Sequence, residues 1–385
     1  MKLLEVVMWP LGELFFRTPI PFVLGGYAET RTTPPEFGVA GMLRSSIMDL
    51  RDAGLLDVED ELLSKVLDLG GEHTTYNFCW RLVGPHLYRD GEVFYPMPMD
   101  VFKKEEGESG KQDQSQGGGQ EGGKVTFMLG DYLIEQLTPI PSGRGFELRR
   151  LLGPAVLDGE EARGWLASAS FMKRYLEGER EFRCVEGRDV VRERDVVEKR
   201  IFPRVKLDRE RKTVEIRDGE GMYYSLEKLI LREGWGFIAG VWLDECSDAA
   251  DVFLKLDGYT VRFGGRSGMV RLEVRWAKSL LERGLNWDVS GEARLLLTSS
   301  AILGDGGYTS FLPSLNVEGG VWRQVWIGGW DYAAGRPKAM YAGVAPGSVY
   351  YLRDVSGGDV LERKFVHPDY RRVLGSSLIA KGWGV

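Results

Sequence analysis

The chain has few cysteines, and their arrangement argues against cysteine-based structural sites. The only cysteines among its 385 residues are Cys79, Cys184 and Cys246. These three are odd in number, lie far apart and form no C-x-x-C pair. The pattern argues against a disulfide framework and against a cysteine zinc site, and it favours a reducing, cytoplasmic environment.

Histidine and long apolar runs are also scarce. His73, His86 and His367 are scattered without the spacing of metal ligands, so we expect neither a metal ion nor a cofactor. No run of eighteen apolar residues exists, which argues against a membrane-spanning helix. Glu5 and Glu13 interrupt the N-terminal segment where a targeting sequence would be apolar, so we expect none there.

Asparagine occurs only three times, whereas 28% of the residues are charged. This composition is typical of thermophilic proteins. Hydrophobic residues make up 43% of the chain, enough to fill a sizeable core. The formal net charge is -7, which argues against a surface that binds nucleic acid everywhere. Between Arg144 and Arg217, however, 19 Lys and Arg outnumber 15 Asp and Glu.

The hydrophobic pattern predicts two α+β halves of unequal character. Apolar residues at i, i+3 and i+4 predict a helix over 35–53 that ends at Gly54, and a shorter helix follows near 59–67. Residues 78–96 predict two strands joined at Asp90-Gly91. The segment 196–231 predicts a long charged hairpin, and from 235 onward the pattern is β-rich, with VFLKL (252–256) among the expected strands.

These patterns place a boundary near residue 218, giving domains 1–217 and 218–385. Residues 103–124 contain no apolar side chain and are predicted to form a disordered loop. A charged arm is expected within about 144–217, where the basic excess lies.

Motifs of known catalytic chemistry are missing or lack their structural context. The run from Gly118 to Val125 almost fits a phosphate-binding loop, but it lies in low-complexity sequence with no preceding strand. The GWGFIA run at 234–239 is followed by more strand where a dinucleotide fingerprint needs a helix. No G-x-S-x-G or H-E-x-x-H motif occurs. We therefore expect no enzymatic activity and no catalytic residue.

One informative segment precedes the first predicted helix. Thr32 and Thr33 lie just before its N-terminus, where free N–H groups and the helix dipole favour a phosphate. Gly41 keeps the helix surface open, and Arg44 follows on the same side. A well-capped core helix would explain these residues equally well.

A second informative segment is the C-terminal VLGSSLIAKGWGV. Glycines let a backbone approach a ligand closely, and successive N–H groups bind anions. The candidate anion-binding residues of this segment are Gly375, Ser376, Ser377, Lys381, Gly382 and Gly384. A third glycine-rich turn, FGGRSG, spans 263–268.

The order of these segments resembles one family. An early FFRTPIPF loop is followed by PPEFGVAGMLRSSIM, the charged hairpin, FGGRSGMVRLE and the terminal GSSLIAKGWG. The chain is similar in this order to the third subunits of the Cmr complex, the type III-B CRISPR effector, within the RAMP superfamily. That family usually has Glu where this chain has Arg266, so the resemblance assigns Arg266 no role.

The resemblance implies two ferredoxin-like (RRM-like) βαββαβ domains with an inserted hairpin or helical arm. It implies a non-catalytic antiviral subunit that grips the 5′ repeat-derived tag of the guide RNA. Its expected partners are that RNA, the large polymerase/cyclase-like subunit and the backbone RAMP subunits, with no membrane. The resemblance makes the phosphate and anion candidates named above candidate RNA-binding residues, and Arg17 in the early loop joins them.

Two alternatives stay open. Some RAMP relatives cleave CRISPR-repeat RNA by general acid–base chemistry, for which His73 is the best candidate here. The chain could instead be a protein-interaction module without RNA contact, which would use the tryptophan-rich VWRQVWIGGWDY (321–332) as its surface.

Overall fold

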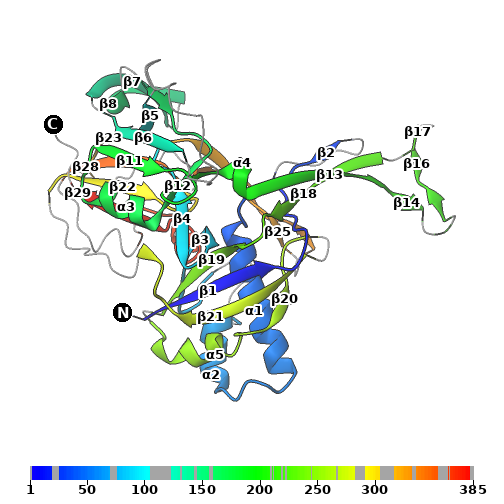
Figure 1. Ribbon diagram of the computed structural model, residues 1–385. Helices are drawn as coiled ribbons and strands as arrows, with labels where there is room; N and C mark the ends of the chain where they lie inside the picture. Colours follow the sequence, from blue (N-terminus) through cyan, green and yellow to red (C-terminus); the bar gives the residue numbers. More distant parts are fainter. Residues whose placement is uncertain are drawn as a thin grey trace, which may run out of the picture. The chain divides into compact units, whose positions relative to one another are not determined.

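The computed structural model describes most of the chain as a mixed α+β protein in which strands predominate (Figure 1). The described residues are 2–19, 26–69, 76–104, 123–130, 132–142, 145–155, 159–208, 210, 212–217, 220–221, 223–243, 245–265, 268–281, 291–303, 316–331, 335–353, 363 and 365–381. The expected α+β class is confirmed. In the described part, no helix is both long and apolar enough to cross a bilayer.

The chain divides into two compact units that each draw on three separate segments. Unit 1 comprises Met1–Asp90, Arg194–Ala277 and Trp326–Tyr341, and unit 2 comprises Gly91–Glu193, Lys278–Val325 and Ala342–Val385. The expected division at 217/218 differs from this one. The reason is that strands which pair in one sheet come from distant parts of the chain, which local sequence patterns do not record.

Unit 1 is built on an antiparallel sheet in the order β3-β19-β1-β21-β20. Its central strand β1 pairs Val6 with Ala239 of β19 on one side and with Val274 of β21 on the other. The sheet strands are β1 (Leu3–Pro10), β3 (Arg81–Arg89), β19 (Trp235–Trp242), β20 (Thr260–Arg262) and β21 (Met269–Trp276).

Three helices gather beside this sheet (Figure 1): α1 (Glu36–Asp52), α2 (Asp60–Leu67) and α5 (Ala250–Leu254). The predicted first helix is confirmed, and its six expected inward residues are all buried: Val39, Met42, Leu43, Ser46, Ile47 and Leu50. Gly54 follows it with φ 68°, the left-handed conformation that ends helices.

The expected strand at 252–256 is wrong. These residues continue from a short 3-10 turn (Ser247–Ala249) into α5. Ala249, Phe253 and Leu256 are completely buried, a spacing that a helix places on one face. Five apolar-rich residues are too few for periodicity to separate helix from strand.

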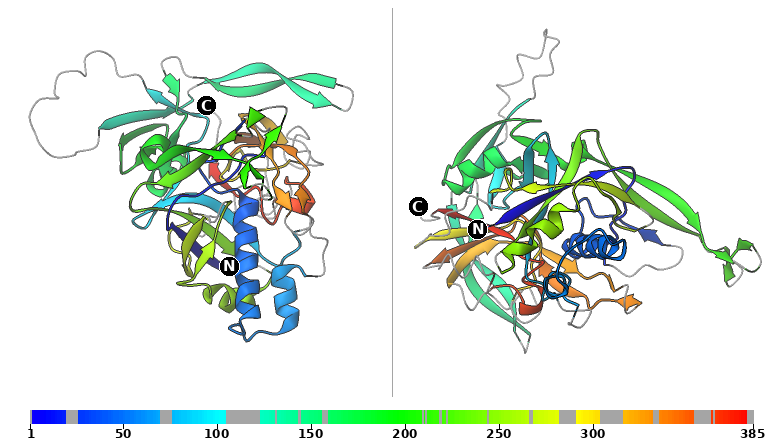
Figure 2. Two further views of the ribbon diagram at one scale, coloured as in Figure 1. Left: turned by 90° about the vertical axis from the view of Figure 1, so that its right-hand side faces the viewer. Right: turned by 90° about the horizontal axis from the view of Figure 1, so that it is seen from below.

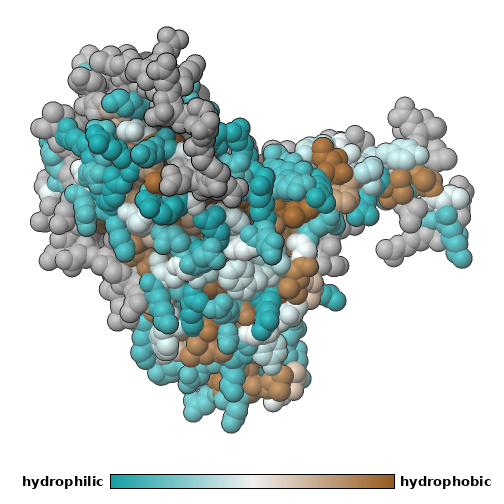
Figure 3. Space-filling model, in the orientation of Figure 1, coloured by the Kyte–Doolittle hydropathy of each residue, from teal (hydrophilic) through white to brown (hydrophobic). Residues whose placement is uncertain are grey.

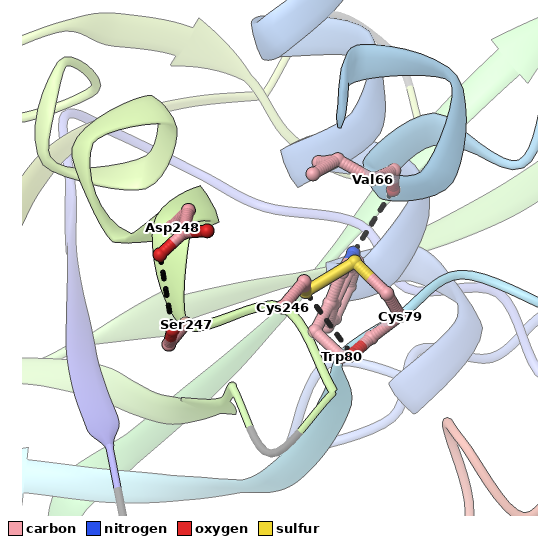
Figure 4. The surroundings of a disulfide bond; sticks show 6 residues. All are labelled: Val66, Cys79, Trp80, Cys246, Ser247 and Asp248. Carbon is pink, nitrogen blue, oxygen red and sulfur yellow. Dashed lines mark hydrogen bonds between the residues drawn. A yellow bond between two sulfur atoms is a disulfide. The ribbon is translucent and has the colours of Figure 1, made fainter. Parts of the chain in front are cut away.

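A disulfide joins Cys79 to Cys246, with the two Cα atoms 5.6 Å apart (Figure 4). The bond lies beside α2, where the Trp80 indole donates to the Val66 carbonyl at 3.0 Å. The expectation of no disulfide is therefore corrected. The spacing of 167 residues carries no pairing signal, because the partners meet only through the pairing of β3 with β19.

A long hairpin projects from unit 1 (Figures 1 and 2), as the sequence predicted. β13 (Val197–Val205) follows the short α4 (Glu193–Val196) and pairs along its whole length with β18 (Tyr223–Leu231). We call this hairpin the arm. Smaller elements complete the unit: β2 (Tyr27–Ala28), β14 (Leu207–Asp208), β15 (Thr213–Val214), β16 (Ile216–Arg217), β17 (Glu220–Gly221), β25 (Trp330–Asp331) and β26 (Arg336–Pro337).

Unit 2 contains three groups of strands, ordered β12-β10-β4, β11-β6-β5-β9 and β29-β22-β28-β23-β8-β7. Its elements are β4 (Glu92–Pro96), β5 (Val101–Lys104), β6 (Lys124–Leu129), β7 (Tyr132–Ser142), β8 (Gly145–Ala155), β9 (Gly159–Glu161), β10 (Trp165–Ser168), α3 (Ala169–Leu176), β11 (Glu181–Val185), β12 (Val190–Arg192), β22 (Ala293–Leu297), β23 (Asn316–Val321), β28 (Val349–Arg353), a 3-10 turn (Pro368–Tyr370) and β29 (Ser377–Lys381). Two further strands are β24 (Gln324–Ile327) and β27 (Tyr341–Val344), and each contains residues of both units.

The predicted loop at 103–124 connects β5 to β6, which pair antiparallel from Val101 opposite Leu129. Lys103, Lys104 and Lys124 belong to these strands, and the rest of the segment, apart from Gly123, lies outside the described residues.

A buried charged cluster fixes α3 within unit 2. Asp100, Tyr175 and Arg294 are each at least 98% buried. The Tyr175 hydroxyl donates to Asp100 at 3.0 Å, and the Arg294 guanidinium lies 3.8 Å from Asp100 and 4.6 Å from the centre of the Tyr175 ring. Burial raises the pKa of Asp100 above its usual value, although Arg294 and Tyr175 act to lower it. The cluster ties α3, which carries Tyr175, to β22, which carries Arg294.

Candidate nucleic-acid interface

The early loop of unit 1 is held by one carboxylate in the middle of the arm, where Glu227 pairs with Ile201. Glu227 of β18 accepts hydrogen bonds from the Tyr27 hydroxyl at 2.6 Å and from the Thr30 N–H at 2.9 Å, and its carboxylate lies 3.3 Å from Lys199 Nζ. Thr30 in turn accepts a hydrogen bond from the Phe16 N–H through its hydroxyl. The loop that carries Arg17 is thereby tied to the arm.

The charges of this cluster reinforce one another. Burial acts to raise the pKa of Glu227, but the hydrogen bonds from Tyr27 and Thr30 and the nearby Lys199 outweigh it, so its pKa lies below the usual value. Burial and the hydrogen bond to Glu227 raise the pKa of Tyr27 to about 12. Glu227 is therefore ionised and Tyr27 protonated at neutral pH. The sequence analysis identified neither Glu227 nor Tyr27, because a glutamate in a charged strand gives no sign of its partners.

The glycine-rich turn at 263–268 packs against the same loop. A Cβ on Gly264 would lie 2.7 Å from the Phe15 carbonyl oxygen, and one on Gly268 would lie 2.4 Å from the Phe263 carbonyl oxygen. The Gly265 N–H donates to the Phe15 carbonyl. These glycines are therefore required for internal packing, and Arg266 lies outside the described residues.

Thr32 and Thr33 lie partly exposed ahead of α1, as expected. The cap residue of α1 is Pro35, and neither threonine caps the helix. The first turn carries the buried Glu36, whose position beside the helix N-terminus competes with an anion there. Arg17 is exposed.

Gly41 and Arg44 have different surroundings, although they share a helix. Gly41 is exposed, and a Cβ added there would meet nothing within 4 Å. The Arg44 guanidinium donates to the Leu67 carbonyl at the end of α2 and lies 6.0 Å from the centre of the Phe78 ring. Arg44 therefore holds α1 against α2 in this structure.

The terminal segment of unit 2 turns its candidate residues inward. The Gly375 N–H donates to the Ser300 carbonyl at 2.8 Å, and the Ser376 N–H donates to the Ser299 hydroxyl at 2.9 Å. Ser376 and Ser377 are buried. A Cβ on Gly375 would lie 2.3 Å from Val366, so this glycine makes room for a neighbouring side chain. Neither N–H group is available to a phosphate.

Lys381 is the last residue of β29, where its backbone pairs with Ala293. Gly382 and Gly384 lie outside the described residues. The structure thus places Arg17, Thr32 and Thr33 in unit 1, whereas the terminal candidates belong to unit 2.

The arm presents two chemically different faces, because cross-strand partners share a face. One face carries Phe202 between cations: Lys228 Nζ lies 4.9 Å and the Arg204 guanidinium 6.0 Å from the centre of its ring. The opposite face exposes Ile201 (62%), Val205 (39%) and Tyr223 (58%). Hydrophobic surface on the arm is visible in Figure 3.

Among the described residues, no group of three or more His, Cys, Asp and Glu side chains lies close enough to hold a metal ion. His86 is buried in β3, and His367 accepts a hydrogen bond from the Asp369 N–H. His73 lies outside the described residues.

A family model described as CRISPR-associated protein (Cas_Cmr3) matches residues 6–383. No curated protein matches the sequence. Among solved structures, the chain is similar to one in a Type III-B Cmr-beta bound to cognate target RNA, with TM-score 0.48, 16% identity and coverage of 96% of this chain and 94% of that chain. It is also similar to a chain of a Csm3-Csm4 subcomplex of the type III-A interference complex, with TM-score 0.47, 11% identity and full coverage of both chains.

Proposed function

The chain belongs to the Cas_Cmr3 family of CRISPR-associated proteins, and from this premise we propose that it is a non-catalytic RNA-binding subunit of a type III-B effector complex. In this proposal it grips the 5′ repeat-derived tag of the guide RNA and docks on the large polymerase/cyclase-like subunit. The observation that carries the proposal is the family match over residues 6–383.

The proposed RNA contacts lie in unit 1, around Arg17, Thr32, Thr33 and Gly41. Arg17 is exposed on a loop that Glu227 and the FGGRSG turn hold in place. A loop fixed before RNA arrives loses little entropy on binding. The basic and aromatic face of the arm, with Phe202 and Arg204, begins next to this loop and supplies further contacts.

The docking part of the proposal is supported by the apolar face of the arm. Ile201, Val205 and Tyr223 expose hydrophobic surface on a projecting element, which favours contact with another protein.

The topology of unit 1 supports the ferredoxin-like part of the proposal. Its elements follow the order β1-α1-β3-β19-α5-β21, and the sheet order β3-β19-β1-β21 is that of a βαββαβ unit. A second such domain is proposed for unit 2.

The proposed role is non-catalytic. His86 is buried in a strand, and His367 accepts a hydrogen bond from its own turn through Nδ1 and is only 20% exposed, which argues against either as the base for an RNA 2′-hydroxyl. His73→Ala and His367→Ala should leave any cleavage of repeat RNA unaltered. Loss of a specific cleavage in either variant would favour the endoribonuclease alternative.

The test of RNA binding is a salt-titrated filter-binding assay with tagged guide RNA and the same RNA without its tag. Wild-type protein should prefer the tagged RNA. Arg17→Ala should weaken binding and reduce the slope of log K against log salt by about one, because one phosphate contact is lost. Arg51→Ala is the matched control, since Arg51 is also exposed and lies in the last turn of α1, away from Thr32 and Thr33. Equal slopes for Arg17→Ala and wild type would remove Arg17 from the interface.

A further inference from the structure

The tryptophan-rich segment is the motif of this chain that the proposed function leaves unused. Residues Trp326–Tyr341 belong to unit 1, although the segments on both sides of them belong to unit 2. Within this segment, β25 pairs with β26 through Trp330 opposite Pro337. We call residues 326–341 the ribbon.

The tryptophans of the ribbon are exposed, contrary to the usual fate of tryptophan. Trp326 is 45% and Trp330 is 48% exposed, and Met340 beside them is 47% exposed. Neither indole makes a hydrogen bond or a ring contact within the described part of the chain. Tryptophan rings left uncovered on a fixed element indicate a binding surface.

An aromatic and cationic anchor fixes the ribbon to unit 1. Phe37 at the start of α1 stacks on Tyr76 with ring centres 5.0 Å apart. Lys338 Nζ lies 5.1 Å from the centre of the Phe37 ring and 4.8 Å from that of Tyr76, and it donates to the Tyr76 hydroxyl. The two tryptophans are thereby presented on a support that is already ordered.

The ribbon also adjoins the proposed RNA loop. A Cβ on Gly328 would lie 3.3 Å from the Cβ of Pro19, two residues beyond Arg17. A Cβ on Gly329 would meet only the Lys338 side chain, at 4.0 Å, and one on Gly335 would meet nothing within 4 Å. These two glycines therefore add no side-chain bulk to the ribbon.

The charges of the ribbon suit a polyanion. It carries two cations, the exposed Arg336 and the anchor residue Lys338, against the single acidic residue Asp331, which lies opposite Arg336 in the register. Flat aromatic rings interleaved with cations are the recurring design of surfaces that bind single-stranded nucleic acid. An aliphatic surface would instead favour a protein partner.

We propose that Trp326 and Trp330 form a stacking platform for unpaired bases, so that single-stranded RNA continues from the Arg17 loop across the ribbon. This inference rests on the proposed function and extends it to a second, sequence-tolerant contact. Stacking is insensitive to base identity, because every base has a π-face.

The test uses the full chain and two probes: tagged guide RNA, and an oligouridylate of about ten nucleotides that carries no tag. Trp330→Ala and Trp326→Ala should each weaken binding of both RNAs by about fivefold or more, with an unchanged salt slope, because stacking releases no counterions. Trp330→Phe should retain most of the affinity. Trp276→Ala is the matched control: it is 46% exposed on β21 and should bind as wild type.

The outcomes separate this inference from the proposed function. Affinity for the oligouridylate that depends on Trp330 supports the platform even when the tag is not preferred. Wild-type affinity of both tryptophan variants for both RNAs overturns it, even when tag binding through Arg17 holds. Loss of a copurifying protein subunit in those variants, with RNA binding intact, would make the ribbon a protein contact and also overturn it. Failure of wild-type protein to bind either RNA overturns both.

Discussion

At the scale of single residues, glycine serves two different purposes in this chain. Gly375 has φ 76° and a side-chain neighbour where its Cβ would be, whereas Gly41 lies in a helix and faces open space. Sequence reasoning gave both the same role, because a glycine-rich motif looks the same whether a ligand or the protein's own backbone approaches it. Only the packed structure distinguishes the two.

The difference predicts opposite effects of adding a methyl group. Gly41→Ala should stabilise the protein by about 0.5–1 kcal/mol, because alanine is the better helix former. It should also lower the affinity for tagged RNA, because the proposed RNA contacts include the surface of α1 at Gly41. Gly375→Ala should lower the melting temperature by several degrees, since it combines positive φ with a clash at Val366. Thermal melts of both variants check this, and equal melting temperatures would contradict it.

At the scale of elements, the sequence predicted those that are long and strongly patterned. The helix at α1 and the arm were found because each repeats its period over many residues. The short α5 was not found, since five residues do not define a period. RNA binding by the candidate residues stays a prediction: Arg17 is exposed and Thr32 and Thr33 are partly exposed, whereas Glu227, which holds their loop, left no local signal.

The connection between β5 and β6 makes a prediction at this scale. Replacing residues 105–122 with a short glycine-containing turn should leave the melting temperature and RNA affinity nearly unchanged. The segment contributes no apolar side chain to the core, and the strands at its two ends already pair with each other. Differential scanning calorimetry and filter binding check this, and a drop of several degrees would show that the segment packs on the protein.

At the scale of the whole molecule, the disulfide between Cys79 and Cys246 predicts redox-dependent stability. Both residues belong to unit 1, and the bond closes a loop with a sequence separation of 167 residues. Reduction should cost about 2–5 kcal/mol in the free energy of unfolding, mainly because the unfolded chain regains freedom. Guanidinium unfolding of wild-type protein with and without a reductant measures the difference.

The double variant Cys79→Ser/Cys246→Ser is the control for that experiment. It should unfold identically with and without the reductant, because Cys184, the free cysteine among the described residues, is buried in unit 2. A wild-type protein that is equally insensitive would show that the two thiols remain reduced in solution.

The interleaving of the two units also bears on how the chain folds as it is synthesised. β1 is made first, yet its partners β19 and β21 begin at Trp235 and Met269. At about 5–20 residues per second, the ribosome needs roughly 10–50 s to supply β21. Both edges of β1 lack their native partners until β19 is made, and one edge still lacks its partner until β21 is made. Long-range pairing of this kind folds slowly. A nascent chain halted before residue 269 therefore exposes an apolar strand, and binding of chaperones should be strongest in that interval.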